Sequence, residues 1–178
     1  MSTGRARVEW MTATVGALAV LASCGGGAEP ARKLTTTDVS GIPAGSATGM
    51  RFSGQYLITS GMVEACACVP SDYCSTAKVN VGRTFTAIQD EGRIQFVFPT
   101  ASDLTYAGGI DADGSYQAGA VVDTSGSLQY VFMKGRIHLG PSGQPVTIDT
   151  TQEYSGKTAE AACDARASFT ADYQPAKM

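Results

Sequence analysis

The sequence predicts an all-β domain, an antiparallel up-and-down meander of about eight strands that closes into a small barrel. Three observations predict this fold class. From about Met50 onward, apolar and polar residues alternate every two positions, as in strands with one buried face. Turns that contain glycine interrupt the alternation at short intervals. Helical periodicity is nearly absent from the same region.

The expected strands follow one another along the chain with short connections. The first covers 51–59 and continues beyond Gly61. The others are expected over residues 84–89, 93–98, 104–110, 115–122, 128–139, 146–154 and 163–173. The last alternates most cleanly, since every second residue from Cys163 to Tyr173 is apolar or aromatic.

One expected strand changes its apolar face partway along. Between 128 and 139, Leu128 and Phe132 share one register, whereas Ile137 and Leu139 share the other. An extra residue in a strand produces such a slip, so the pattern predicts a β-bulge near Gly135.

Short turns between consecutive strands predict hairpins and therefore a closed meander. Asp90-Glu91-Gly92 is one hairpin signal, and Asp113-Gly114 is the strongest, because both turn positions tolerate positive φ. Closing into a barrel removes the exposed edges of such a meander, and a two-sheet sandwich is the alternative. In strand count and hairpin connectivity the pattern is similar to lipocalin-like barrels. The first and last strands would then be neighbours.

Aromatic residues occur on almost every expected strand, so they bear on what the barrel contains. An eight-stranded barrel either packs its interior solid or holds one small ligand. Solid packing is the commoner outcome for an apolar lining. The many alanines of 163–173 are small, however, and would leave room for a ligand.

The amino-terminal residues carry a separate signal. Arg5 and Arg7 precede an uncharged, largely apolar stretch over 10–22, which is shorter than the roughly 20 residues that span a bilayer. The stretch closes with Leu21-Ala22-Ser23-Cys24, a lipobox, and in this the chain resembles bacterial lipoprotein precursors. The resemblance implies diacylation of the Cys24 sulfur, cleavage before Cys24 and acylation of the new amino terminus.

These signals divide the chain into three parts. Residues 1–23 form a lipoprotein signal peptide, 24–49 a flexible tether rich in Gly, Ala, Ser, Thr and Pro, and 50–178 the β domain. The resemblance implies a lipid-anchored protein of the cell envelope. Because Gly25, rather than Asp, follows the lipidated cysteine, it also implies sorting to the outer membrane.

Composition argues against nucleic acid as a partner. The chain has 13 Lys and Arg residues against 16 Asp and Glu residues, a net charge of −3. Removing the signal peptide, with Arg5, Arg7 and Glu9, leaves the remainder slightly more acidic. A nucleic-acid binder needs a basic stripe, whereas these cations are scattered.

Four cysteines remain once Cys24 carries lipid, and an exported chain is expected to pair them as two disulfides. Cys66 and Cys68 point to the same face of an extended strand about 7 Å apart, so they should take different partners. We expect Cys66 with Cys163 and Cys68 with Cys74, although sequence alone leaves three pairings open. A thiolate metal site is the alternative, but the C-x-C spacing and the compartment argue against it.

No pattern in the chain predicts an enzyme, a metal site or a cofactor. His138 is the sole histidine and has no motif that would supply a nucleophile, so it is expected to be a structural or surface residue. Asp111, Asp113 and Ser115 superficially resemble a calcium loop, yet they lack the distal Glu of an EF-hand, and a hairpin turn explains them.

The function expected from these observations is binding rather than catalysis. We expect a lipid-anchored envelope protein whose β domain binds a small apolar ligand or a protein partner. The alternative is a structural or assembly lipoprotein with no ligand cavity. A filled interior would favour use of the outer surface, and an open cavity would favour a ligand.

Overall fold

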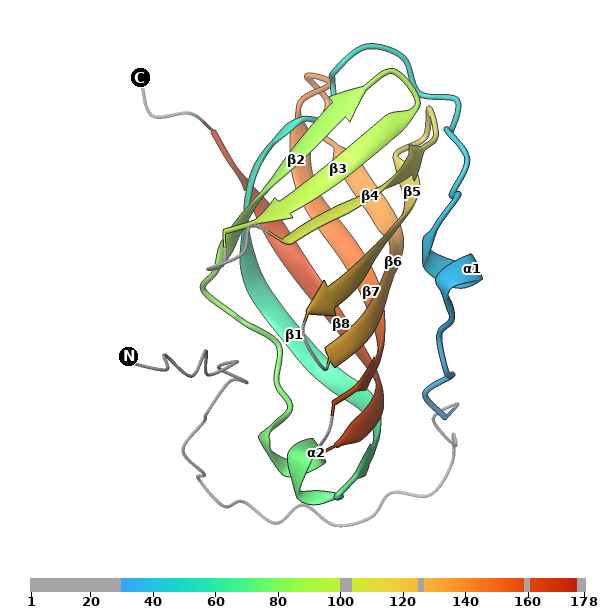
Figure 1. Cartoon of the computed structure of the whole chain (residues 1–178). Helices are drawn as coiled ribbons and strands as arrows, with labels where there is room; N and C mark the ends of the chain where they lie inside the picture. The colour runs from blue at the N-terminus through green and yellow to red at the C-terminus, as the bar shows by residue number, and fades with distance from the viewer. Residues whose placement is uncertain (1–29, 100–103, 125–126, 159–160, 176–178) are drawn as a thin grey trace, which may run out of the picture.

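The computed structural model describes residues 30–99, 104–124, 127–158 and 161–175, so the predicted signal peptide and Cys24 lie outside the described residues. Eight antiparallel strands form a closed barrel in chain order (Figure 1). They are β1 (Gly54–Val69), β2 (Thr84–Asp90), β3 (Arg93–Phe98), β4 (Leu104–Ile110), β5 (Ser115–Thr124), β6 (Ser127–Leu139), β7 (Pro145–Lys157) and β8 (Ala162–Gln174). The predicted fold class is therefore confirmed.

Two short helices, α1 (Thr36–Val39) and α2 (Asp72–Thr76), accompany the barrel. Within the described part of the chain, no helix has the length and apolar character needed to cross a membrane.

The barrel closes by pairing its first strand with its last. Tyr56 lies opposite Tyr173 near one end of this seam, and Cys68 lies opposite Cys163 at the other. The expected adjacency of the first and last strands is confirmed, and the sandwich alternative is excluded.

Aromatic side chains pack the half of the barrel that contains β2 to β4, which is the upper half in Figure 1. Phe85 is 1 % exposed and lies at the centre of this packing. Its ring stacks on Tyr56 at 5.6 Å and on Phe98 at 4.8 Å, and it meets Phe96 edge to face at 6.0 Å. Tyr116 is buried beside them, 2.6 Å from the Thr150 hydroxyl. This half of the interior is solidly packed.

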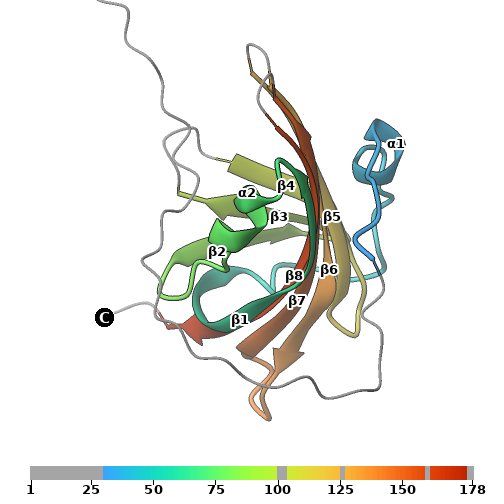
Figure 2. The same ribbon diagram turned by 90° about the horizontal axis from the view of Figure 1, so that it is seen from below.

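The interior of the lower half is less enclosed, because β2 to β4 are too short to extend along it. These strands have 6 or 7 residues, whereas β1 has 16 and β6 to β8 have 13 each. The connection from β1 to β2, including α2, folds back across this end (Figure 2). The change shows in the inward-facing pairs of β7 and β8. Thr150 and Phe169 are buried, whereas Gln152 and Ala167, the next pair down, are half-buried.

Residues 30–49, which we call the strap, climb the outside of the barrel from β7 across β6 and β5 to β4 and β3 (Figure 1). Leu34 is 1 % and Val39 4 % exposed, and both pack with Phe132 of β6 in a second apolar cluster outside the barrel. The Leu34 N–H also donates to the Ser155 hydroxyl at 2.7 Å. The structure thus differs from the predicted tether over 30–49, because two isolated apolar residues find an apolar strand face to cover.

The strap lies against the barrel at glycines. A Cβ atom on Gly92, Gly109 or Gly119 would come within 2.4 Å of a carbonyl oxygen of the strap. The backbone of the strap follows this row and bonds to it, as in the 2.8 Å bond from the Gly45 N–H to the Gly92 carbonyl. Close approach of two backbones is a recognised reason for glycine in a strand.

The switch of apolar residues from one face of β6 to the other also results from the packing of the strap. Pairing of β6 with β5 and β7 runs without a shift through Gly135, so the predicted bulge at that position is wrong. Leu128 and Phe132 point outward and Ile137 points inward because β6 has apolar residues on both faces. Of the outward residues, the strap covers Phe132 and packs against Tyr130, whereas Leu128 stays exposed.

Candidate functional site

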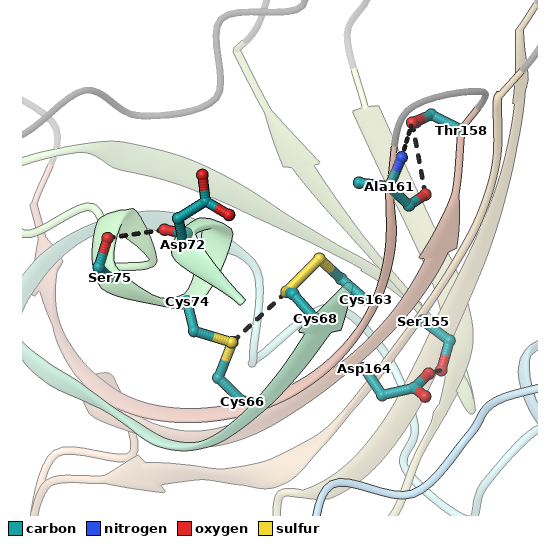
Figure 3. The surroundings of a disulfide bond; sticks show 10 residues. All are labelled: Cys66, Cys68, Asp72, Cys74, Ser75, Ser155, Thr158, Ala161, Cys163 and Asp164. Atoms are coloured by element: carbon teal, nitrogen blue, oxygen red, sulfur yellow. Dashed lines mark hydrogen bonds between the residues drawn. A yellow bond between two sulfur atoms is a disulfide. The ribbon is translucent and has the colours of Figure 1, made fainter. Parts of the chain in front are cut away.

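The disulfides cross-link the lower end of the barrel (Figure 3). They join Cys66 to Cys74 and Cys68 to Cys163. The expectation that Cys66 and Cys68 take different partners is confirmed, but the pairing expected from the sequence is wrong. Cys66 would face Cys163 if β1 and β8 paired without interruption. Shifts after Ile58 and after Val63 move the register by two residues, so Cys68 faces Cys163 instead.

Each disulfide restrains a different element. Cys68–Cys163 crosses the seam between β1 and β8, and Cys66–Cys74 holds α2 against β1. The sulfurs of Cys66 and Cys68 are 3.6 Å apart. Neither sulfur carries a proton in the disulfide form, so this is a nonbonded contact. The sulfurs of Cys66, Cys68 and Cys74 lie within 4.8 Å of one another, so the reduced thiolates would suit a metal; the disulfides occupy all of them here.

A groove of about 690 Å³ lies on the outer face of β1, β6, β7 and β8, and we call it the outer groove. Alternation along β6, β7 and β8 directs polar side chains into it, while the intervening residues point to the core; on β1 the exposed Met62 also lines it. Its polar lining comprises Ser60, Lys134, Arg136, His138, Asp149, Thr151, Ser168 and Thr170. Hydroxyl groups and cations therefore share one surface.

His138 lies in the outer groove and has a carboxylate partner. Its Nε2 is 2.9 Å from Oδ2 of Asp149, and the Thr170 hydroxyl donates to Oδ1 of the same carboxylate at 2.9 Å. Asp149 thus joins the imidazole and the hydroxyl, whereas nucleophilic catalysis needs a hydroxyl or thiol at the imidazole itself. His138 is exposed, and the arrangement suits binding of a polar ligand. The sequence reasoning missed Asp149, because only strand pairing brings it beside His138.

The two other cations of the outer groove differ in what they bind. Arg136 contacts the Asp113 carboxylate and the Ser115 hydroxyl across the neighbouring strand. Lys134 is exposed, and within the described residues no carboxylate pairs with its ammonium group. Lys134 is therefore the cation in this groove that remains available to an external anion.

The aspartates that resemble a calcium loop serve the hairpin turn. Asp113 accepts the Ser115 N–H at 2.9 Å, and this bond is the main cause that lowers the pKa of its carboxyl, with Arg136 adding to it. Asp111 accepts both the N–H and the hydroxyl of Ser46, each at 2.9 Å. Both carboxylates bond within the protein, one to the turn and one to the strap.

A second groove, of about 380 Å³, runs beside the strap over β3 to β5. Val39 to Pro43 form one wall, and Arg93, Gln95 and Gly119 contribute to the other. The Arg93 guanidinium donates to the Ile42 carbonyl at 2.8 Å, so this groove is partly closed by the strap's own contacts.

Comparison of the chain with models of protein families, with curated proteins and with solved structures finds no match. The functional argument therefore depends on the residues described above.

Proposed function

We propose that the chain is a lipid-anchored protein of the bacterial cell envelope whose barrel binds an acidic segment of a protein partner in the outer groove. The lipobox ending at Cys24 supports the anchor, and Gly25 supports the outer membrane as its site. The solid packing around Phe85 supports use of the outer surface rather than the upper interior.

The observation that carries the proposal is the exposed ammonium group of Lys134 in the outer groove, to which the described part of the chain supplies no carboxylate. His138 and a row of hydroxyl donors lie beside it. Carboxylates are natural partners for such donors, since hydrogen bonds to a charged acceptor are shorter and stronger than neutral ones. A cation that already has a carboxylate partner, as Arg136 has, would bind an external carboxylate much more weakly.

Site-specific photo-crosslinking in the native host tests this binding. A photoreactive residue at Thr151, in the outer groove, is expected to give a discrete protein adduct that Lys134→Glu abolishes. The matched position is Ile88, which is exposed on β2, a strand that contributes no residue to this groove. Equal adducts from both positions, or an adduct that Lys134→Glu leaves unchanged, would contradict the proposal.

A small apolar ligand in the lower half of the barrel is the second candidate. The observation in its favour is that Ala165 and Ala167, both inward-facing and small, are only half-buried. Native mass spectrometry of the protein purified from its host distinguishes the two, because a retained small molecule would support the ligand and a bare domain would oppose it.

A further inference from the structure

The chain enters the barrel at its lower end, which limits where an anchor on Cys24 could hold it. The Leu34 N–H donates a hydrogen bond to the Ser155 hydroxyl near the lower end of β7, and this hydroxyl in turn donates to the Asp164 carboxylate of β8 at 2.6 Å. Figure 1 shows the beginning of the strap at this end. The attachment point of the barrel is therefore fixed relative to its strands.

The distance from the anchor to the barrel is short. Five residues separate Cys24 from Pro30, the first described residue. Even a fully extended chain covers at most about 21 Å over the six steps between their Cα atoms. The upper turns of the barrel lie at the far end of strands of 13 residues, each of which spans roughly 40 Å. The tether therefore holds the lower end within about 21 Å of the anchor, whereas the upper end lies roughly 40 Å farther along the strands, which favours an orientation with the lower end toward the membrane.

An exposed group of side chains, which we call the lower patch, lies beside this entry point. Val121 is 43 % and Leu128 39 % exposed, and they stand diagonally across the β5–β6 pair. Lys157, also exposed, lies directly opposite Leu128 on β7, and Asp123 lies opposite Leu128 on β5. Apolar groups beside a lysine suit the interface of a bilayer, where the chain of the lysine is buried and its ammonium meets lipid phosphate.

We infer that the lower patch of Val121, Leu128 and Lys157 rests on the lipid surface into which the acyl chains of Cys24 insert. The inference depends on the proposed lipid anchor. The bilayer is its occupant because the short chain to Cys24 brings this rim to the membrane. Contact here also leaves the outer groove, which opens around Lys134 and His138 farther up β6, free for a partner.

Tryptophan fluorescence measures this orientation. The single Trp of the chain is Trp10, in the predicted signal peptide, so the processed protein has none. Leu128→Trp places a reporter in the lower patch, and Val146→Trp is its matched control, an apolar residue that is 49 % exposed near the upper end of β7. Val121→Trp is a second reporter if the first variant fails to fold.

The lipidated protein is reconstituted into vesicles whose phospholipid chains carry bromine, a short-range quencher. We expect strong quenching of Trp at 128 or 121 and little at 146. Equal quenching at both ends, none at either end, or stronger quenching at 146 in vesicle-bound protein would overturn the orientation alone. Failure of the protein to float with vesicles would instead overturn the anchor, and the orientation with it.

Discussion

Glu153 shows how single residues hold the strap to the barrel. Its side chain is 10 % exposed on the outer face of β7, and its Oε2 accepts a bond of 2.5 Å from Nε of Arg32. The same guanidinium bonds to Asp38 at 2.8 Å and lies over the Phe132 ring at 5.5 Å. The Glu153 contact accordingly raises the pKa of Arg32. A nearly buried carboxylate depends on this cation, because removing its partner leaves its desolvation uncompensated.

Replacing Arg32 is therefore expected to lower the free energy of unfolding more than replacing an arginine in an exposed ion pair. Arg32→Ala should lower the free energy of unfolding by about 1–3 kcal/mol, a value discounted because Arg32 is itself 48 % exposed. Arg136→Ala, whose pair with Asp113 is about half exposed on both sides, should lower the free energy of unfolding much less, because solvent screens an exposed pair. Denaturant unfolding of both variants measures the difference, and equal losses would show that Glu153 does not need its cation.

The buried tyrosines predict behaviour at alkaline pH. Burial raises the pKa values of Tyr56, Tyr106, Tyr116 and Tyr154 above the ordinary value for tyrosine. Because the folded state holds these protons more tightly, the stability they contribute is complete below about pH 10, the ordinary tyrosine pKa, and is lost as the pH rises further.

We expect tyrosinate absorbance from these residues to develop together with the loss of near-ultraviolet circular dichroism. The same chain in denaturant should ionise its tyrosines near the ordinary pKa. Ionisation of all tyrosines at that pKa while the fold persists would mean that the barrel core is accessible to solvent.

At the scale of elements, the surface of the strap is complementary to the strands beneath it. The glycines at 92, 109 and 119 allow the backbones to touch, and α1 turns Val39 onto β6 after Thr35 and Asp38 form a capping box. Bonds from the Thr35 hydroxyl and N–H are the main causes that lower the pKa of Asp38, with Arg32 contributing less. The strap is thus a folded part of the domain.

Gly119→Ala tests this fit. The added Cβ would stand 2.4 Å from the Val39 carbonyl oxygen, so the strap must move away. We expect a loss of about 1–3 kcal/mol in unfolding free energy, as for overpacked sites, and faster proteolysis within 30–49. Gln117→Ala, on the same outward face of β5, should change neither. A protected strap in Gly119→Ala would refute the close contact.

The two disulfides should differ in their contribution to stability. They span 95 and 8 residues, and the chain-entropy relation gives about 4.7 kcal/mol for Cys68–Cys163 and about 2.5 kcal/mol for Cys66–Cys74. Paired Cys→Ser replacements avoid leaving a free thiol beside the remaining bond. Thermal or denaturant unfolding of the two double variants should show the larger loss for Cys68 and Cys163; the reverse order would contradict the pairing.

At the scale of the whole molecule, the sequence predicts what depends on local alternation and misses what depends on register. Period-two patterning and the Asp113-Gly114 turn were enough to predict eight antiparallel strands and their closure. The disulfide pairing was not predictable, because two shifts in β1 that have no signal in composition decide which cysteine meets Cys163.

The strap was missed for a related reason. Leu34 and Val39 are isolated in a polar stretch, and only the fold places them opposite Phe132. The outward apolar residues of β6 are the available signal, but in the sequence their change of face is equally typical of a bulge. Among the residues of the outer groove, His138 was predicted to be a surface or structural residue and lies exposed in the groove, whereas Asp149 and Lys134 were not singled out, since neither belongs to a motif.

The mass of the intact protein isolated from the membranes of its native host tests the central claim, an exported lipid-anchored barrel closed by disulfides. We predict a chain that begins at Cys24, carries acyl groups there, and gains mass on reduction in the amount expected for two disulfides. A chain that retains Met1, carries no lipid and has free thiols at all its cysteines would contradict it.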